Sequence, residues 1–172
     1  MHVLFVCTGN ICRSPTAERL AIADAARSHF QDFTASSAGT HALMGHPIQA
    51  NAARVLENLG GDASGFTARQ LTPTIASDAD LVLTMTVAHR DRVLKLAPQQ
   101  LHKTFTLREA ARLVSECNAR HVADLAAFRP RFPAREPSDI PDPIGHDEAF
   151  FEMVGARIAD LLPSILELCQ RA

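Results

Sequence analysis

The chain has 172 residues, of which 47% are hydrophobic and 21% charged, and its formal net charge is −2. A chain of this length is typical of one domain with a substantial core, so we expect a single domain over residues 1–172. The weak net charge gives no global attraction to nucleic acid or to an anionic membrane, and neither is expected as a partner. Four scattered cysteines do not resemble a disulfide framework, and the N-terminal apolar run is too short for a signal peptide. We therefore expect a cytoplasmic protein with reduced thiols.

The first half of the chain alternates between strand and helix patterns. A short apolar run followed by a glycine-containing turn is typical of a buried parallel strand. Ser14 and Pro15 predict the N-cap and the first residue of the helix that comes next. The predicted elements are a strand over Val3–Val6, a helix over Pro15–Phe30, a strand over Phe33–Ser37 and a helix over Ile48–Leu59.

The second half continues the alternation and then changes character. The stretch Arg129–Pro143 contains five prolines and is predicted to be a long loop. Pro163 is expected to kink or break the last helix. The predicted elements are a strand over Asp80–Thr84, a helix over Val87–Leu96, a strand over Thr104–Leu107, helical sequence over Arg108–Phe128 and a last helix from about Asp147.

Strands that alternate with helices predict an α/β fold with a parallel sheet and right-handed crossovers. In such folds, ligands bind beyond the carboxyl ends of the strands. The segment that begins at Cys7 follows the first predicted strand, so it lies where a site is expected.

The stretch "CTGNICRS", from Cys7 to Ser14, is the strongest chemical signal in the chain. Its cysteine lies in a polar loop, which suits a reactive thiolate better than a packing residue. A loop of this size, with Thr8, Gly9, Asn10, Ile11 and Cys12 between the cysteine and the arginine, can turn its backbone N–H groups inward and bind a tetrahedral oxyanion. The guanidinium of Arg13 can grip two oxygens of that anion, and the start of the following helix adds positive potential. The Ser14 hydroxyl could donate a hydrogen bond to the sulfur, and together these features suit phosphoryl transfer to Cys7.

The stretch "VCTGNICRSPTAE" resembles the signature of the low-molecular-weight protein tyrosine phosphatases. "SSAGTHALMGHP", "TARQLT", "DADLVLTM" and "DIPDPIG" resemble further segments of that family in the same order. The resemblance implies a three-layer fold with a four-stranded parallel sheet, a cysteinyl-phosphate mechanism, and no metal or organic cofactor.

The resemblance also implies roles for single residues. Cys7 would be the nucleophile, Arg13 the phosphate clamp and Ser14 the group that stabilises the thiolate. Asn10 would hold the strained turn of the loop, and Ser37 would belong to the supporting hydrogen-bond network. The expected partners are phosphorylated proteins or small aryl phosphates, together with inorganic phosphate and other oxyanions.

A phosphatase needs a general acid for the leaving oxygen. Asp142, in Asp142-Pro143, matches the position of the acid in the family. Asp139 and Asp147 are nearby alternatives, but Asp139 precedes the motif and Asp147 is predicted to cap the last helix.

Several positions depart from the family pattern. The chain has no Tyr and no Trp, and it has Ile144 and the run from His41 to Met44 where many members carry aromatic pocket walls. Phe66 stands where many members have a histidine that supports the phosphate loop. Ile11 resembles tyrosine-directed members, whereas phosphoarginine-directed relatives tend to have threonine, so the resemblance favours an aryl phosphate substrate.

Cys12 has two interpretations. Either it packs behind the loop, or it forms a reversible disulfide with Cys7 that protects the nucleophile from irreversible oxidation.

Two other functions use the same loop. An arsenate reductase would need an external small thiol here, because Thr84–Leu94 contains no cysteine. A catalytically silent phosphate-binding module is the other alternative, and the joint presence of Cys7, Arg13, Ser14 and Asp142 argues against it.

Overall fold

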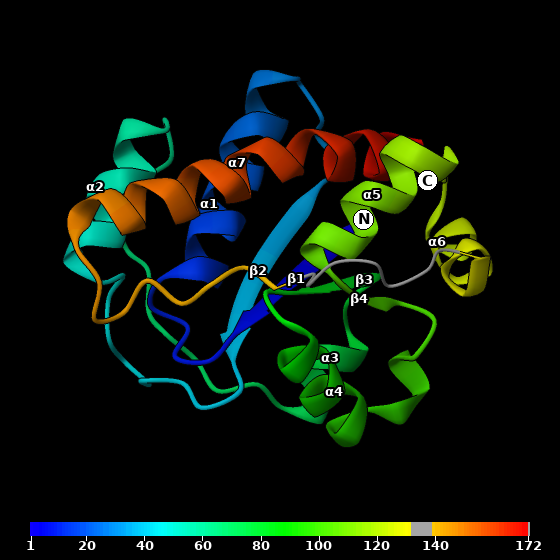
Figure 1. Ribbon diagram of the computed structural model, residues 1–172, viewed down its shortest axis with the longest axis horizontal. Helices are drawn as coiled ribbons and strands as arrows, with labels where there is room; N and C mark the ends of the chain where they lie inside the picture. The colour runs from blue at the N-terminus through cyan, green and yellow to red at the C-terminus, as the bar shows by residue number, and fades with distance from the viewer. Residues whose placement is uncertain (132–138, 172) are drawn as a thin grey trace.

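The sheet at the centre of the molecule is parallel and four-stranded, in the order β2-β1-β3-β4 (Figure 1). The computed structural model describes residues 1–131 and 139–171. The predicted α/β fold is confirmed. Its strands are β1 (His2–Cys7), β2 (Thr34–Gly39), β3 (Leu81–Thr84) and β4 (Thr104–Thr106).

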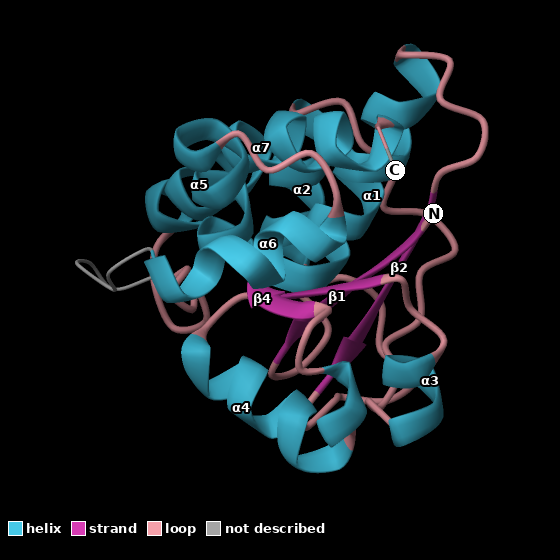
Figure 2. Cartoon of the chain, turned by 90° about the vertical axis from the view of Figure 1, so that its right-hand side faces the viewer, coloured by secondary structure: helices cyan, strands magenta, loops and turns pink. Residues whose placement is uncertain are grey.

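Helices cover both faces of the sheet, so the molecule has three layers (Figures 1 and 2). One face carries α1 (Arg13–Arg27), α2 (Ala50–Asn58), α5 (Leu107–Cys117), α6 (Val122–Phe128) and α7 (Glu148–Gln170). The other face carries α3 (Pro73–Ser77) and α4 (Val87–Leu96). Short 3₁₀ helices lie at Pro98–Gln100 and Arg129–Arg131. Within the described residues, no helix is both long and apolar enough to cross a membrane.

The side-chain alternation of β1 explains the layers. Successive residues of a strand point to opposite faces of the sheet. Val3 and Phe5 pack into the larger core beneath α1 and α7, whereas Leu4 and Val6 pack into the smaller core beneath α3 and α4. All four side chains are fully buried, which is why this strand is apolar throughout.

Most predicted elements are present with shifted ends. The helical sequence Arg108–Phe128 is two helices, because Asn118 adopts a left-handed conformation (φ 55°) that ends α5. Of the kink or break expected at Pro163, the break is absent, because α7 continues through Pro163 to Gln170. Asp147 is the N-cap of α7, as predicted. The predicted loop over Arg129–Pro143 begins with a 3₁₀ turn, and 132–138 lie outside the described residues.

The connections place one crevice at the carboxyl edge of the sheet. From β1 the chain crosses to β2 on one side, and from β2 it crosses back over β1 to β3 on the other side. The loops after β1 and β3 therefore diverge, which makes this the switch point where α/β folds bind ligands. Cys7 ends β1 at this point.

Candidate functional site

The segment 7–14, here called the Cys7 loop, is held from outside by the segment after β2. Backbone N–H groups of that segment donate to its carbonyl oxygens, in the pairs Thr40 to Cys7, His41 to Thr8, Leu43 to Gly9 and Gln49 to Ile11, at 2.8–3.0 Å. In a trans peptide the N–H points opposite to the C=O. The N–H groups that follow these carbonyls therefore face the inside of the loop, where they form a nest for an anion.

Asn10 fixes the turn of the Cys7 loop. It is fully buried and has a left-handed backbone (φ 56°), which asparagine tolerates better than most residues. Its Nδ2 donates to Ser14 Oγ at 3.0 Å and to Ser37 Oγ at 2.8 Å, and its Oδ1 accepts from Arg69 N at 2.9 Å. The Ser37 hydroxyl in turn donates to Glu18 Oε2 at 2.6 Å. Asn10 thus connects the loop with β2 and α1, as the sequence indicated for Asn10 and Ser37.

Ser14 lies beside the sulfur of Cys7, at 2.9 Å between Oγ and Sγ, and both side chains are buried. Because Ser14 Oγ accepts from Asn10, its own hydrogen is free to point at the sulfur. The predicted N-cap role of Ser14 was wrong. The helix α1 begins at Arg13, its N-cap is Cys12, and no side chain caps it. The Ser14 hydroxyl is engaged by the sulfur instead of by the first turn of the helix.

Arg13 brings the loop together with the segment that carries Asp142. Its guanidinium is almost fully buried; NH1 donates to Ile140 O at 3.0 Å and NH2 to Asp142 Oδ2 at 2.6 Å. Its Nε is buried and has no partner among the described residues. A buried N–H without an acceptor is costly, and an anion in the Cys7 loop would satisfy it.

Asp142 lies 129 residues away from Arg13 in sequence and faces the same cavity. Its side chain is 47% exposed, and its Oδ1 accepts from Ile144 N at 3.2 Å. The segment is also fastened to the turn after β3, because Ile140 N donates to Met85 O and Val87 N donates to Asp139 Oδ1. Asp139 is thus occupied in holding the segment, whereas Asp142 is open to the cavity.

The cavity above the Cys7 loop has a volume of about 370 Å³. Its apolar walls are aliphatic: Leu43 and Ile144 are each about half exposed, and Ile11 of the Cys7 loop lines the cavity with them. Gly9 also lines the cavity. Among the described residues, no phenylalanine, tyrosine or tryptophan lines the cavity, although the imidazole of His41 does.

Cys12 is buried, and besides lining the cavity it packs against the core. It is 5% exposed and lies with Ala52, Val55 and Phe151 around a small void. Burial first, and then the nearby Cys7 and Asp142, raise the pKa of the Cys12 thiol to about 12, against the opposing charge of Arg13. This environment favours the packing interpretation, because a resolving thiol acts as the thiolate.

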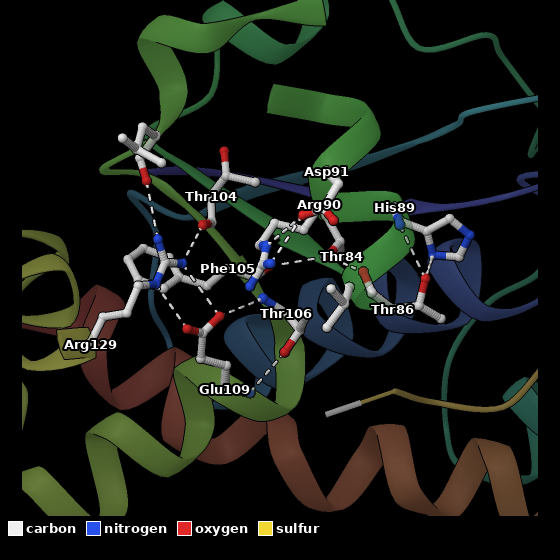
Figure 3. Close-up of polar contacts among 12 residues, drawn as sticks. Thr84, Thr86, His89, Arg90, Asp91, Thr104, Phe105, Thr106, Glu109 and Arg129 are labelled. Carbon is white, nitrogen blue, oxygen red and sulfur yellow. Dashed lines mark hydrogen bonds and ion pairs between the residues drawn. The ribbon is translucent and has the colours of Figure 1, made fainter. Parts of the chain in front are cut away.

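Sequence reasoning did not find His89, which lies in the first turn of α4. Its ring is buried; Nε2 is 2.8 Å from Thr8 Oγ1, and Nδ1 is 2.9 Å from Thr86 Oγ1. Figure 3 shows the ring beside Thr86. Burial and, after it, the charge of Arg13 lower the pKa of His89 to about 4, against the opposing charges of Asp142 and Asp139.

Glu18 and Arg19, on α1, contact Ser37 and Phe66 respectively. Burial raises the pKa of Glu18, opposed first by the hydrogen bond from Ser37 and then by the charges of Arg19 and Arg69. The guanidinium of Arg19 lies over the Phe66 ring, 5.6 Å from its centre. No group of three histidine, cysteine, aspartate or glutamate side chains that could hold a metal ion occurs within 1–131 and 139–171.

Comparison with known proteins gives a consistent family. The family model described as low molecular weight phosphotyrosine protein phosphatase matches residues 2–115. The chain is similar to Etp, a low molecular weight protein-tyrosine-phosphatase of Escherichia coli K12, with 42% identity over 102 residues; the match covers 59% of this chain and 66% of Etp, just under two thirds of its length. It is also 29% identical over 151 residues to Ptp of Acinetobacter johnsonii, covering 88% of this chain and 85% of that protein.

Two solved structures are similar over nearly the whole chain. A low molecular weight protein tyrosine phosphatase from T. tengcongensis aligns with a TM-score of 0.78 and 31% identity, covering 97% of this chain and 98% of the other. The YwlE arginine phosphatase of Geobacillus stearothermophilus aligns with a TM-score of 0.76 and 28% identity, covering 98% and 92%.

Proposed function

Because the chain belongs to the low molecular weight phosphotyrosine protein phosphatase family, we propose that it hydrolyses aryl phosphate monoesters, including phosphotyrosine, through a phosphoryl intermediate on Cys7. One observation carries the proposal. A thiol, an arginine with an unsatisfied buried Nε, and a half-exposed carboxylate line one cavity.

Substrate binding begins in the Cys7 loop. The phosphoryl oxygens accept hydrogen bonds from the inward N–H groups and from Arg13, whose Nε gains the partner that it lacks. The anion competes with Asp142 for the guanidinium, so the Arg13–Asp142 contact of 2.6 Å opens when substrate binds.

Transfer to sulfur follows. The Cys7 thiolate attacks phosphorus in line with the leaving oxygen, the S–P bond forms, and the P–O bond to the phenol breaks. Asp142, freed from Arg13 and protonated from the solvent, donates that proton to the departing oxygen. Water then attacks the phosphoryl group on Cys7, Asp142 takes the proton of that water, and the thiolate leaves with the Ser14 hydroxyl, 2.9 Å away, hydrogen-bonded to it.

The cavity walls support an aryl substrate. Ile11, Leu43 and Ile144 offer aliphatic contact to a ring, and Asp142 is the one carboxylate among the described residues that line the cavity. A phosphoarginine substrate would instead place a cationic guanidinium group against these aliphatic walls, which suit an uncharged ring better. The proposal places the protein in the cytoplasm, where phosphorylated proteins would be its substrates.

The test is a side-by-side assay of the wild type, Cys7→Ser and Cys117→Ser. Cys117→Ser is the matched control, because it makes the same chemical change in α5. We expect hydrolysis of an aryl phosphate by the wild type and Cys117→Ser only, with slower turnover of phosphoarginine and no thiol-dependent reduction of arsenate. Arsenate reduction without phosphate ester hydrolysis would replace the proposal by the reductase alternative.

A further inference from the structure

The contacts of His89 form a hydrogen-bonded chain that ends at the cavity. The ring joins Thr86, at the N-cap of α4, to Thr8 in the Cys7 loop, 81 residues away in sequence. Thr8 is exposed and lines the cavity. The proposed mechanism gives these hydrogen bonds no role, although they reach the place where the anion binds.

Counting the protons favours one direction for these hydrogen bonds. A neutral ring has one N–H, and each hydroxyl has one hydrogen, so three hydrogens serve two ring contacts and one is left over. Thr86 Oγ1 already accepts from the backbone N–H of His89 at 3.1 Å. If Nδ1 were protonated, Thr86 Oγ1 would accept twice and its own hydrogen would be spare, yet the Thr86 hydroxyl has no other acceptor within 1–131 and 139–171.

The other tautomer satisfies every buried group. The Thr86 hydroxyl donates to Nδ1, Nε2–H donates to Thr8 Oγ1, and the spare hydrogen belongs to the exposed Thr8 hydroxyl. Burial keeps the ring neutral and the charge of Arg13, which faces it from α1, adds to this, whereas Asp142 and Asp139 in the segment before α7 oppose it. A neutral ring is what this arrangement needs, because a second ring N–H would oppose the donor from Thr86.

We propose that His89 is a positioning residue that presents the Thr8 hydroxyl as a hydrogen-bond donor to the oxyanion bound in the Cys7 loop. The proposal rests on the proposed function for its substrate, but it is tested on inorganic phosphate alone. Thr8 touches the anion, and His89 acts through Thr8.

The experiment is a double-mutant cycle read out by calorimetric titration with inorganic phosphate. Thr8→Val removes the hydroxyl at nearly constant shape, and His89→Leu removes the ring contacts. A hydrogen bond to a charged group corresponds to roughly a 10-fold to 100-fold change in affinity. We expect a loss of roughly 10-fold for each single variant and no further loss in the double variant, because both remove one donor.

Three variants separate positioning from a general effect on the fold. Thr8→Ser keeps the hydroxyl and should bind phosphate like the wild type. His89→Gln can offer an amide N–H near the place of Nε2 and should recover part of the affinity. His102→Leu, an exposed histidine before β4 at the opposite edge of the sheet, is the matched control and should have no effect.

Independent losses that add in the double variant would overturn the proposal, as would wild-type affinity in Thr8→Val. If His89→Leu does not fold, nitrogen NMR of the wild-type ring decides: Nε2–H supports the proposal and Nδ1–H contradicts it. If the protein binds phosphate with this coupling but hydrolyses no phosphate ester, the proposed function is refuted and this inference stands. If the protein binds no phosphate, this inference is overturned.

Discussion

Replacing Asn10 should separate the backbone strain of the Cys7 loop from its hydrogen bonds. Asn10→Gly keeps the left-handed conformation accessible but removes all three side-chain contacts, which leaves the N–H of Arg69 without a partner. An unsatisfied donor costs about 1–3 kcal/mol and each neutral hydrogen bond contributes about 0.5–1.5 kcal/mol. We expect the free energy of unfolding to fall by about 2–6 kcal/mol, the sum of one unsatisfied donor and two lost hydrogen bonds, since Ser14 and Ser37 retain their other partners.

Asn10→Ala adds the strain term. An alanine at this φ costs about 1 kcal/mol more than glycine. Asn118 is the matched control, because it has the same conformation (φ 55°), is exposed, and makes no side-chain hydrogen bond to a described residue. Asn118→Gly should be nearly neutral, and Asn118→Ala should again be about 1 kcal/mol less stable than Asn118→Gly.

Urea unfolding of the four variants measures the hydrogen-bond and strain contributions to stability. The kcat/KM for an aryl phosphate reports whether the loop keeps its active geometry. Both Asn10 variants should lose most activity and both Asn118 variants should keep it. If Asn10→Gly is as stable as the wild type, the hydrogen-bond network does not hold the loop. If alanine and glycine are equally stable at position 10 but not at 118, the strain argument fails.

Three further predictions concern the same site. Asp142→Asn should slow hydrolysis of phenyl phosphate by roughly 10²–10⁴-fold and that of an ester with a strongly acidic phenol much less; equal losses would remove Asp142 from the acid role. Iodoacetamide at neutral pH should label Cys7 but not Cys12, whose pKa of about 12 keeps it protonated; mass spectrometry that finds both alkylated at similar rates would contradict this. Because the pKa of His89 falls from 6.5 to about 4 on folding, the unfolded chain binds more protons in that window. Stability should therefore decline by up to about 3 kcal/mol as pH drops from 6.5 to 4, and the difference between wild type and His89→Gln over this range should isolate the effect; parallel pH curves would refute it.

The sequence predicts best what is local. Cys7 and Arg13 belong to one short loop between a strand and a helix, so their shared location follows from the order of the elements. The location of Asp142 followed from the resemblance, and the structure adds its contact with Arg13. The role of Ser14 as an N-cap was mistaken, because the propensity of serine for that position takes no account of a neighbouring sulfur that competes for the hydroxyl.

Contacts between distant segments could not be predicted. Asp139 binds the N–H of Val87, 52 residues away, and nothing in the local pattern of either residue indicates this. The contact of His89 with Thr8 could not be predicted either, because a histidine in an amphipathic helix is ordinarily solvated. The signal that could have found it is the strand-helix junction at Thr86, which places the first turn of α4 beside the Cys7 loop at the carboxyl edge of the sheet.

The central claim is that Cys7 carries the phosphoryl group between the two steps, and rapid quenching tests it most directly. The wild type and Asp142→Asn would be mixed with an ester of a strongly acidic phenol, stopped in acid within milliseconds, digested and analysed by mass spectrometry. The account predicts one phosphoryl group on the sulfur of Cys7, accumulating further in Asp142→Asn, where the base for the hydrolytic water is missing. Turnover with no phosphorylated Cys7 at any time, or with the phosphoryl group on another residue, would contradict it.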